Sequence, residues 1–120
     1  MSDKTNDKII SEARARTREV QAADVKAMLA RGENVVYLDV REPNEFNLGH
    51  LPAAVHVPLG SLELRVEAAV PRDARIVTYC SAGVRSVLAA DTLQRMGYAD
   101  VVSMAGGLRA YVATGAPVEG

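Results

Sequence analysis

The 120-residue sequence has a single cysteine, Cys80, no tryptophan and one phenylalanine. One cysteine excludes an intrachain disulfide, and a structural zinc or iron–sulfur site needs more thiolates than one. The two histidines, His50 and His56, add too few ligands for a mixed metal site. The sequence therefore predicts no metal and no cofactor, and it leaves Cys80 as a packing residue, a bystander or a nucleophile.

The sequence also lacks an excess of charge of one sign, since 14 Lys and Arg balance 15 Asp and Glu. We therefore expect no nucleic-acid partner and no binding to an acidic membrane surface. Apolar runs such as residues 35–38 end after about five residues, whereas a membrane span needs about 20. Residues 1–16 are polar and lack the apolar middle of a signal peptide. We expect a soluble, cytoplasmic protein, because a free thiol persists in a reducing compartment.

Short apolar runs alternate with helix-like segments along a chain long enough to form one hydrophobic core. This pattern predicts an α/β domain with a mostly parallel central sheet of about five strands flanked by helices. Residues 1–16 are expected to be a polar, helix-forming extension outside the core, and residues 17–120 the folded domain. The expected strands are 17–20, 35–39, 54–57, 75–79 and 101–104. The expected helices are 8–18, 24–31, 43–48, 62–70, 86–96 and 107–112.

Cys80 follows the expected strand 75–79, at the end of a parallel strand where ligands bind in such sheets. The next six residues are Ser81, Ala82, Gly83, Val84, Arg85 and Ser86. They lead into a helix, whose free N–H groups and dipole stabilise an anion and lower the pKa of a cysteine thiol. A buried packing cysteine would fit apolar neighbours on both sides, so the small and polar residues here favour a nucleophile.

Each residue type in this loop has a use in anion chemistry. The small residues allow the loop to curl with its N–H groups pointing inward, and Gly83 can take a positive φ. Arg85 supplies a planar positive charge that suits oxyanions. Ser86 can cap the following helix or donate its hydroxyl to the loop.

The loop resembles the active-site loop of the rhodanese family of sulfurtransferases, and three other stretches support the resemblance. Residues 38–46 (LDVREPNEF) resemble the first signature of the family, and residues 49–54 (GHLPAA) resemble its Gly-His-Ile-Pro-Gly-Ala turn. Residues 106–108 with Tyr111 resemble the closing Gly-Gly segment. The likeness runs through residues 17–120, in the order of the family, and implies a rhodanese-like domain.

The resemblance implies a double displacement of sulfur. A donor such as thiosulfate would load Cys80, the nucleophile, as a persulfide, and the N–H groups of residues 81–86 would cradle the thiolate, the persulfide and the donor. Arg85 would bind this small anionic donor. A thiophilic acceptor, which is cyanide, a thiol or a protein, would then remove the sulfur. The chain has no second thiol to resolve the persulfide, so the acceptor must be another molecule.

Two alternatives to sulfur transfer rank lower. Four residues separate Cys80 from Arg85, and within the superfamily that this loop resembles, the four-residue loop goes with sulfur transfer. Phosphatase and arsenate chemistry goes with a longer loop. A non-catalytic docking domain of rhodanese type is disfavoured because Cys80 and Arg85 are both present.

Further polar residues are expected to support the site. Asp39 and Arg41 should form a buried ion pair that holds a strand–helix turn, together with Glu45, although they could instead tune the charge of the loop. His50 should form hydrogen bonds within its Gly-His-Leu-Pro turn. His56 should be structural, since it points away from its two valine neighbours.

Three residues depart from the family pattern. Ala53 stands where glycine is usual, so its turn should avoid a positive φ. Tyr111 stands where tryptophan is common, and Gln21 stands where a helix-capping serine or threonine is common. None of these departures touches the thiol chemistry.

Overall fold

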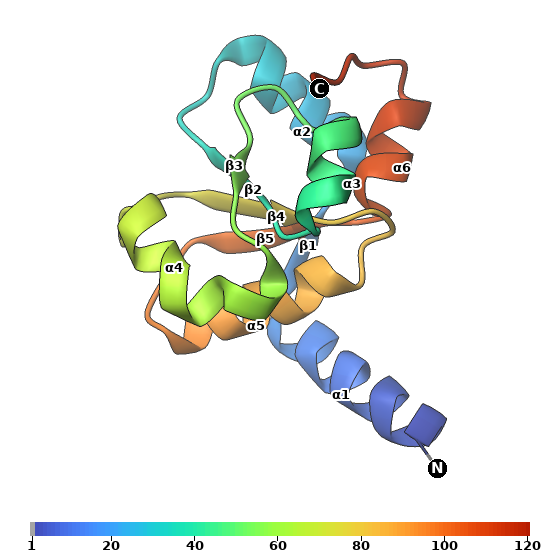
Figure 1. The fold of residues 1–120 in the computed structure, drawn as a ribbon, viewed down its shortest axis with the longest axis vertical. Helices are drawn as coiled ribbons and strands as arrows, with labels where there is room; N and C mark the ends of the chain where they lie inside the picture. Colours follow the sequence, from blue (N-terminus) through green and yellow to red (C-terminus); the bar gives the residue numbers. More distant parts are fainter. Residues whose placement is uncertain (1) are drawn as a thin grey trace.

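A computed structural model describes the fold of residues 2–120 and the side-chain surroundings of residues 6–120. Five strands form one sheet in the order β1-β5-β4-β2-β3, and every neighbouring pair is parallel (Figure 1). The strands are β1 (Arg18–Val20), β2 (Val36–Asp39), β3 (Val55–His56), β4 (Ile76–Tyr79) and β5 (Val101–Met104). The helices are α1 (Ser2–Arg16), α2 (Ala22–Arg31), α3 (Pro43–Leu48), α4 (Leu62–Ala69), α5 (Arg85–Arg95) and α6 (Gly107–Ala113), with a 3-10 turn at Leu59–Ser61. The expected α/β fold with a parallel sheet is confirmed.

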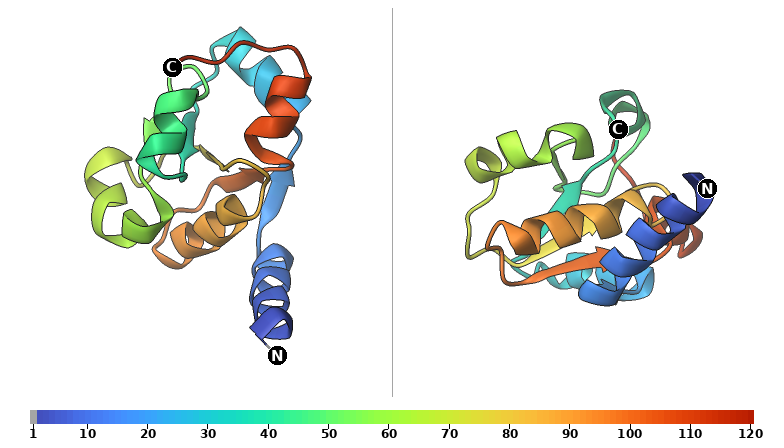
Figure 2. Two further views of the ribbon diagram at one scale, coloured as in Figure 1. Left: turned by 45° about the vertical axis from the view of Figure 1, so that its right-hand side comes forward. Right: turned by 90° about the horizontal axis from the view of Figure 1, so that it is seen from below.

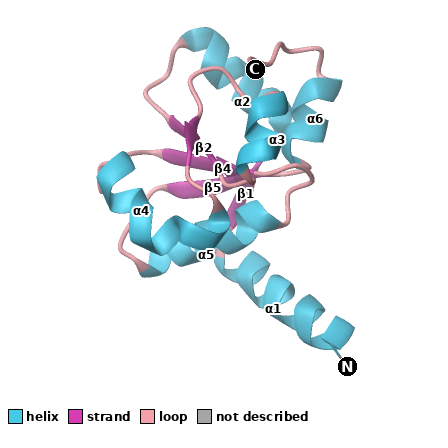
Figure 3. Cartoon of the chain, in the orientation of Figure 1, coloured by secondary structure: helices cyan, strands magenta, loops and turns pink. Residues whose placement is uncertain are grey.

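Helices cover both faces of the sheet, with α4 and α5 on one face and α2 and α6 on the other (Figures 2 and 3). Side chains alternate along the strands, so the three inner strands β2, β4 and β5 contribute to an apolar core on each face of the sheet. Leu38 packs with α4 and α5, whereas its neighbour Tyr37 packs with α2 and α6. All four residues of the central strand β4 are buried. This explains the continuous apolar runs of the sequence, which are typical of parallel strands covered on both faces.

The N-terminal helix α1 points away from the body of the molecule, and its last turns contact α5 (Figure 1). Ala13 is buried there, and Arg16 binds Asp91 of α5 through two hydrogen bonds of 2.8 and 2.9 Å. The helix begins and ends earlier than the expected segment 8–18. None of residues 6–16 of α1 belongs to either apolar core, but the helix is docked on the domain. A boundary after residue 16 stays a prediction.

The turn after β2 and α3 corrects one expectation. Ala53 has a φ of 63°, although the sequence predicted that its turn avoids positive φ. The Ala54 N–H donates to the Leu51 carbonyl at 3.1 Å. Proline at the second position and a left-handed residue at the third are the pattern of a type II turn. The closed turn therefore imposes the left-handed conformation on Ala53, at a cost of about 1 kcal/mol.

No helix among residues 2–120 is long and apolar enough to cross a membrane.

Candidate active site

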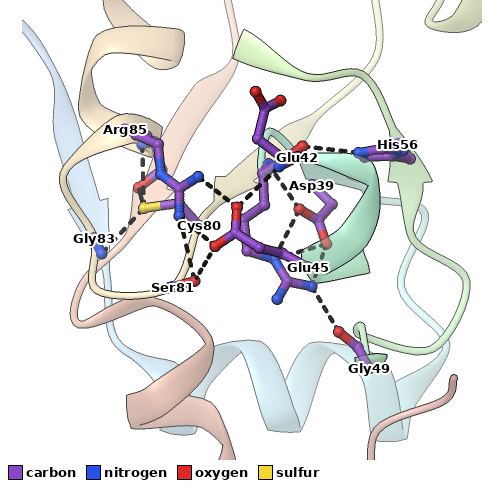
Figure 4. Close-up of polar contacts among 11 residues, drawn as sticks. Asp39, Glu42, Glu45, Gly49, His56, Cys80, Ser81, Gly83 and Arg85 are labelled. Carbon is purple, nitrogen blue, oxygen red and sulfur yellow. Dashed lines mark hydrogen bonds and ion pairs between the residues drawn. The ribbon is translucent and has the colours of Figure 1, made fainter. Parts of the chain in front are cut away.

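Cys80 lies at the end of the central strand β4, where the chain turns into α5 (Figure 4). Because all strands are parallel, the ends of β2 and β5 lie at the same edge of the sheet. The loop 81–84 bends over the sulfur, and α5 begins at Arg85. Cys80 is only 1% exposed. The fold thus brings a thiol, a helix N-terminus and two strand ends together.

The loop directs hydrogen-bond donors at the sulfur. The Gly83 N–H lies 3.1 Å from Sγ of Cys80, and the Ser86 N–H lies 3.4 Å from it. The Ser86 hydroxyl is 3.5 Å from the same sulfur. Burial alone would raise the pKa of the Cys80 thiol, but the hydroxyl and N–H of Ser86 and the N–H groups of Gly83 and Ala82 outweigh it. The pKa of Cys80 is lowered, so the site favours the thiolate.

Two glycines allow the loop to close around the sulfur. Gly83 has a φ of 91°, and a Cβ there would lie 2.8 Å from the backbone of the Gly-Gly segment that opens α6. A Cβ on Gly107 would lie 2.5 Å from the Ser81 carbonyl carbon. The Leu108 N–H donates to the Cys80 carbonyl at 2.7 Å. The start of α6 therefore supports the loop from below, and larger residues at either glycine would push it away.

Arg85 forms a two-point ion pair with Glu45 of α3, at 2.7 and 2.9 Å (Figure 4). The Ser81 hydroxyl donates to the same carboxylate at 3.1 Å. The Arg85 guanidinium is the main cause that lowers the pKa of Glu45 to about 2, with the Glu42 N–H and Ser81 hydroxyl adding to it against the effect of burial. The positive charge of Arg85, which was expected to bind an anionic sulfur donor, is thus already balanced by the Glu45 carboxylate.

Asp39 and Arg41 form the expected buried ion pair at the end of β2. Arg41 donates from Nη2 to Asp39 Oδ2 at 2.7 Å and from Nε to Oδ1 at 3.0 Å. A further bond from Nη2 to the Gly49 carbonyl ties the end of β2 to the end of α3. Glu45 takes no part in this pair, which corrects the expectation that the three act together, because the first turn of α3 points its carboxylate at the loop of Cys80 (Figure 4).

Both histidines bind backbone carbonyls, but the expectation that His50 bonds within its own turn is corrected, because its ring reaches back one helical turn to α3. His50 Nδ1 donates to the Phe46 carbonyl at 2.9 Å, and His56 Nε2 donates to the Arg41 carbonyl at 2.8 Å. The Phe46 ring stacks on both imidazoles, at centroid distances of 3.8 and 4.5 Å. These contacts make the two histidines part of the α3 scaffold.

The sequence did not single out Ser103 or Arg14, which the structure brings to the site. The Ser103 hydroxyl, fully buried on β5, donates to Ser86 Oγ at 2.8 Å. Because a serine hydroxyl has one proton, this contact leaves the Ser86 proton free for the sulfur. Arg14 of α1 donates to the Gly83 carbonyl at 3.4 Å. A polar residue inside the apolar run 101–104 was the one available signal for Ser103.

Within the described part of the chain, no three His, Cys, Asp or Glu side chains gather as a metal site would require.

The sequence model of the family described as "Rhodanese-like domain" matches residues 21–114. The chain belongs to this family. A "Sulfurtransferase" of Allochromatium vinosum is 32% identical over 83% of this chain and 92% of its own length. The "Thiosulfate sulfurtransferase PspE" of Escherichia coli is 36% identical over 61% of this chain and 70% of its own. Two further curated relatives are longer, and the chain spans 53% and 56% of them.

Solved structures share this fold. The "Rhodanese-like domain" of the Anabaena sp. protein Alr3790 superposes with a TM-score of 0.80 at 30% identity, over 85% of this chain and 78% of the other. A Rhodopseudomonas palustris protein of unknown function, described as a "Possible Tyrosine Phosphatase", superposes with a TM-score of 0.87 at 32% identity. That alignment covers 95% of this chain and 93% of the other.

Proposed function

We propose that this rhodanese-like domain is a sulfurtransferase that carries sulfane sulfur as a persulfide on Cys80. The observation that carries the proposal is the set of donors around the sulfur: the N–H groups of Gly83 and Ser86 and the Ser86 hydroxyl. They favour a thiolate that is ready to attack, and no separate general base is required. The curated relatives named sulfurtransferases support the same chemistry.

The reaction has two displacements. The Cys80 thiolate attacks the sulfane sulfur of thiosulfate or of a related persulfide, and sulfite or a thiolate leaves with the bonding electron pair. Cyanide or an acceptor thiolate, on a small molecule or a protein, then attacks the outer sulfur. Thiocyanate or a new persulfide leaves, and the Cys80 thiolate is restored. The N–H groups of residues 81–86 would hold negative charge in both steps. A thiolate carrier of this kind suits a reducing compartment such as the cytoplasm.

Formation of thiocyanate from thiosulfate and cyanide tests this function. The wild-type protein should turn over, and Cys80→Ser should be inactive, because a hydroxyl at this position does not form the persulfide. A matched control is Ser61→Ala, which removes a hydroxyl that binds the Pro58 carbonyl. Folded wild-type protein without turnover for thiosulfate and for organic persulfides would favour a docking role instead.

A second assay measures hydrolysis of an aryl phosphate, because a structural neighbour is described as a "Possible Tyrosine Phosphatase". We expect no hydrolysis, because only four residues lie between Cys80 and Arg85 and Glu45 already occupies both terminal nitrogens of that arginine. Cys80-dependent phosphate release would overturn the assignment.

A further inference from the structure

A hollow of about 390 Å³ opens beside the Cys80 loop. Ser81, Leu108, Arg109 and Val112 line it. The Leu108 N–H donates to the Cys80 carbonyl at 2.7 Å, and the Arg109 N–H donates to the Ser81 carbonyl at 3.1 Å. These bonds fix the wall of the hollow, which is α6, directly against the residue that carries the nucleophile.

The lining of this hollow combines one cation with hydrocarbon. Arg109 is exposed, and no carboxylate of residues 6–120 lies within ion-pair distance of its guanidinium. Val112 is 50% exposed, and Leu108 is partly buried beside it. A carboxylate next to a short hydrocarbon segment would match both features.

The arginine of the Cys80 loop, Arg85, differs from Arg109 because a carboxylate already pairs with it. Its two terminal nitrogens bind Glu45 at 2.7 and 2.9 Å, and the carboxylate is also held by Ser81. A compact dianion such as thiosulfate would have to displace this carboxylate to reach the guanidinium. The uncompensated positive charge beside the loop is therefore that of Arg109, which matches one carboxylate.

We propose that the preferred sulfur-exchanging substrate of this site is an organic persulfide, or the corresponding thiol as acceptor, that carries a carboxylate. Arg109 binds the carboxylate, and the hydrocarbon segment lies against Leu108 and Val112. The proposal rests on the sulfurtransferase function proposed above. The Cys80 thiolate attacks the outer sulfur of the persulfide, a Sγ–S bond forms, the S–S bond of the donor breaks, and the donor leaves as a thiolate. The proton of the persulfide stays on the transferred sulfur, and no oxidant or reductant is consumed.

The test compares three donors at subsaturating concentration: the persulfide of mercaptopropionate, the persulfide of its neutral amide, and thiosulfate. The readout is the rate at which Cys80 gains one sulfur atom, followed by intact mass. Arg109→Gln should slow loading from the carboxylate persulfide about tenfold, the effect of losing one charge-assisted hydrogen bond. Loading from the amide and from thiosulfate should change less than about twofold. Arg65→Gln, an exposed arginine on α4 outside the hollow, is the matched control and should change nothing.

Glu45→Gln provides an independent arm, because it removes the charge that balances Arg85. Thiosulfate loading should then rise relative to loading from the carboxylate persulfide. If Arg109→Gln slows loading from all three donors equally, or does not slow loading from the carboxylate persulfide, the proposed role of Arg109 is overturned. Wild-type protein that no donor loads would instead overturn the proposed function itself. Circular dichroism of each variant separates these outcomes from a loss of fold.

Discussion

Replacing Ser86 with alanine tests how the loop holds the Cys80 thiolate. The substitution keeps the backbone N–H but removes the hydroxyl 3.5 Å from the sulfur. It also leaves the fully buried Ser103 hydroxyl without its acceptor at 2.8 Å. Two consequences follow, one for the reactivity of the thiol and one for the stability of the fold.

The magnitude follows from the contact. A hydrogen bond to a charged group contributes about 1.5–3 kcal/mol, and the long distance to Ser86 favours the lower end. About 1.5 kcal/mol changes the ratio of thiolate to thiol about tenfold at a given pH. The stranded Ser103 hydroxyl should lower the free energy of unfolding by about 1–3 kcal/mol.

Alkylation of Cys80 by iodoacetamide across a pH series measures the thiolate fraction, because the thiolate is the nucleophile. In Ser86→Ala the pKa of Cys80 should rise, so alkylation slows about tenfold at acidic pH and reaches the wild-type plateau at alkaline pH. Thr78→Val is the matched control, since that buried hydroxyl binds the Ser86 carbonyl and not the sulfur. An unchanged pH profile in Ser86→Ala, or an equal shift in Thr78→Val, would refute the reasoning.

Four further substitutions give expected outcomes. The pKa of Glu45 is lowered to about 2, so its contribution to stability is complete above its ordinary pKa and is lost as the pH falls toward about 2. In Glu45→Gln, the urea midpoint of unfolding should therefore fall less steeply with decreasing pH than in the wild type. An unchanged acid dependence would contradict this. Asp39→Ala leaves a buried arginine unpaired and should lower the free energy of unfolding by about 3–5 kcal/mol, whereas a loss below about 1 kcal/mol would show that the pair is not buried in solution. Ala13→Glu places a carboxylate under α5 and should expose α1 to limited proteolysis without unfolding the domain; equal protection in both proteins would argue against docking of the helix. Ala53→Gly removes the strain of an alanine at positive φ but raises the conformational entropy of the unfolded chain, so the melting temperature should stay the same or rise. A loss of more than about 1 kcal/mol in the free energy of unfolding would contradict the turn assignment.

Much of the fold could be predicted because it depends on short-range patterns. Short apolar runs that end at glycine or charged residues predicted the parallel strands. Apolar residues spaced at the helical period of 3.6 residues predicted the helix that ends before Gly97. Gly83 can take a positive φ without steric cost, and it has a φ of 91°. The prediction for Ala53 was wrong because residue type alone opposes positive φ, whereas the closed turn behind Pro52 imposes it.

The arrangement of the site was less predictable, because it depends on contacts between distant elements. The partner of Glu45 could not be read from the sequence, since α3 and the Cys80 loop meet only once the sheet has assembled. Ser103 reaches Ser86 only because β5 lies beside β4 in the sheet. The hollow at Arg109 depends equally on how α6 docks beneath the loop.

The central claim, that Cys80 carries sulfur, is tested most directly by the intact mass of the protein after incubation with thiosulfate or an organic persulfide. Wild-type protein should gain one sulfur atom that maps to Cys80 and that disappears on addition of cyanide or a thiol, and Cys80→Ala should gain none. A folded wild-type protein that gains no sulfur from either donor, or that gains it equally in Cys80→Ala, would contradict the account.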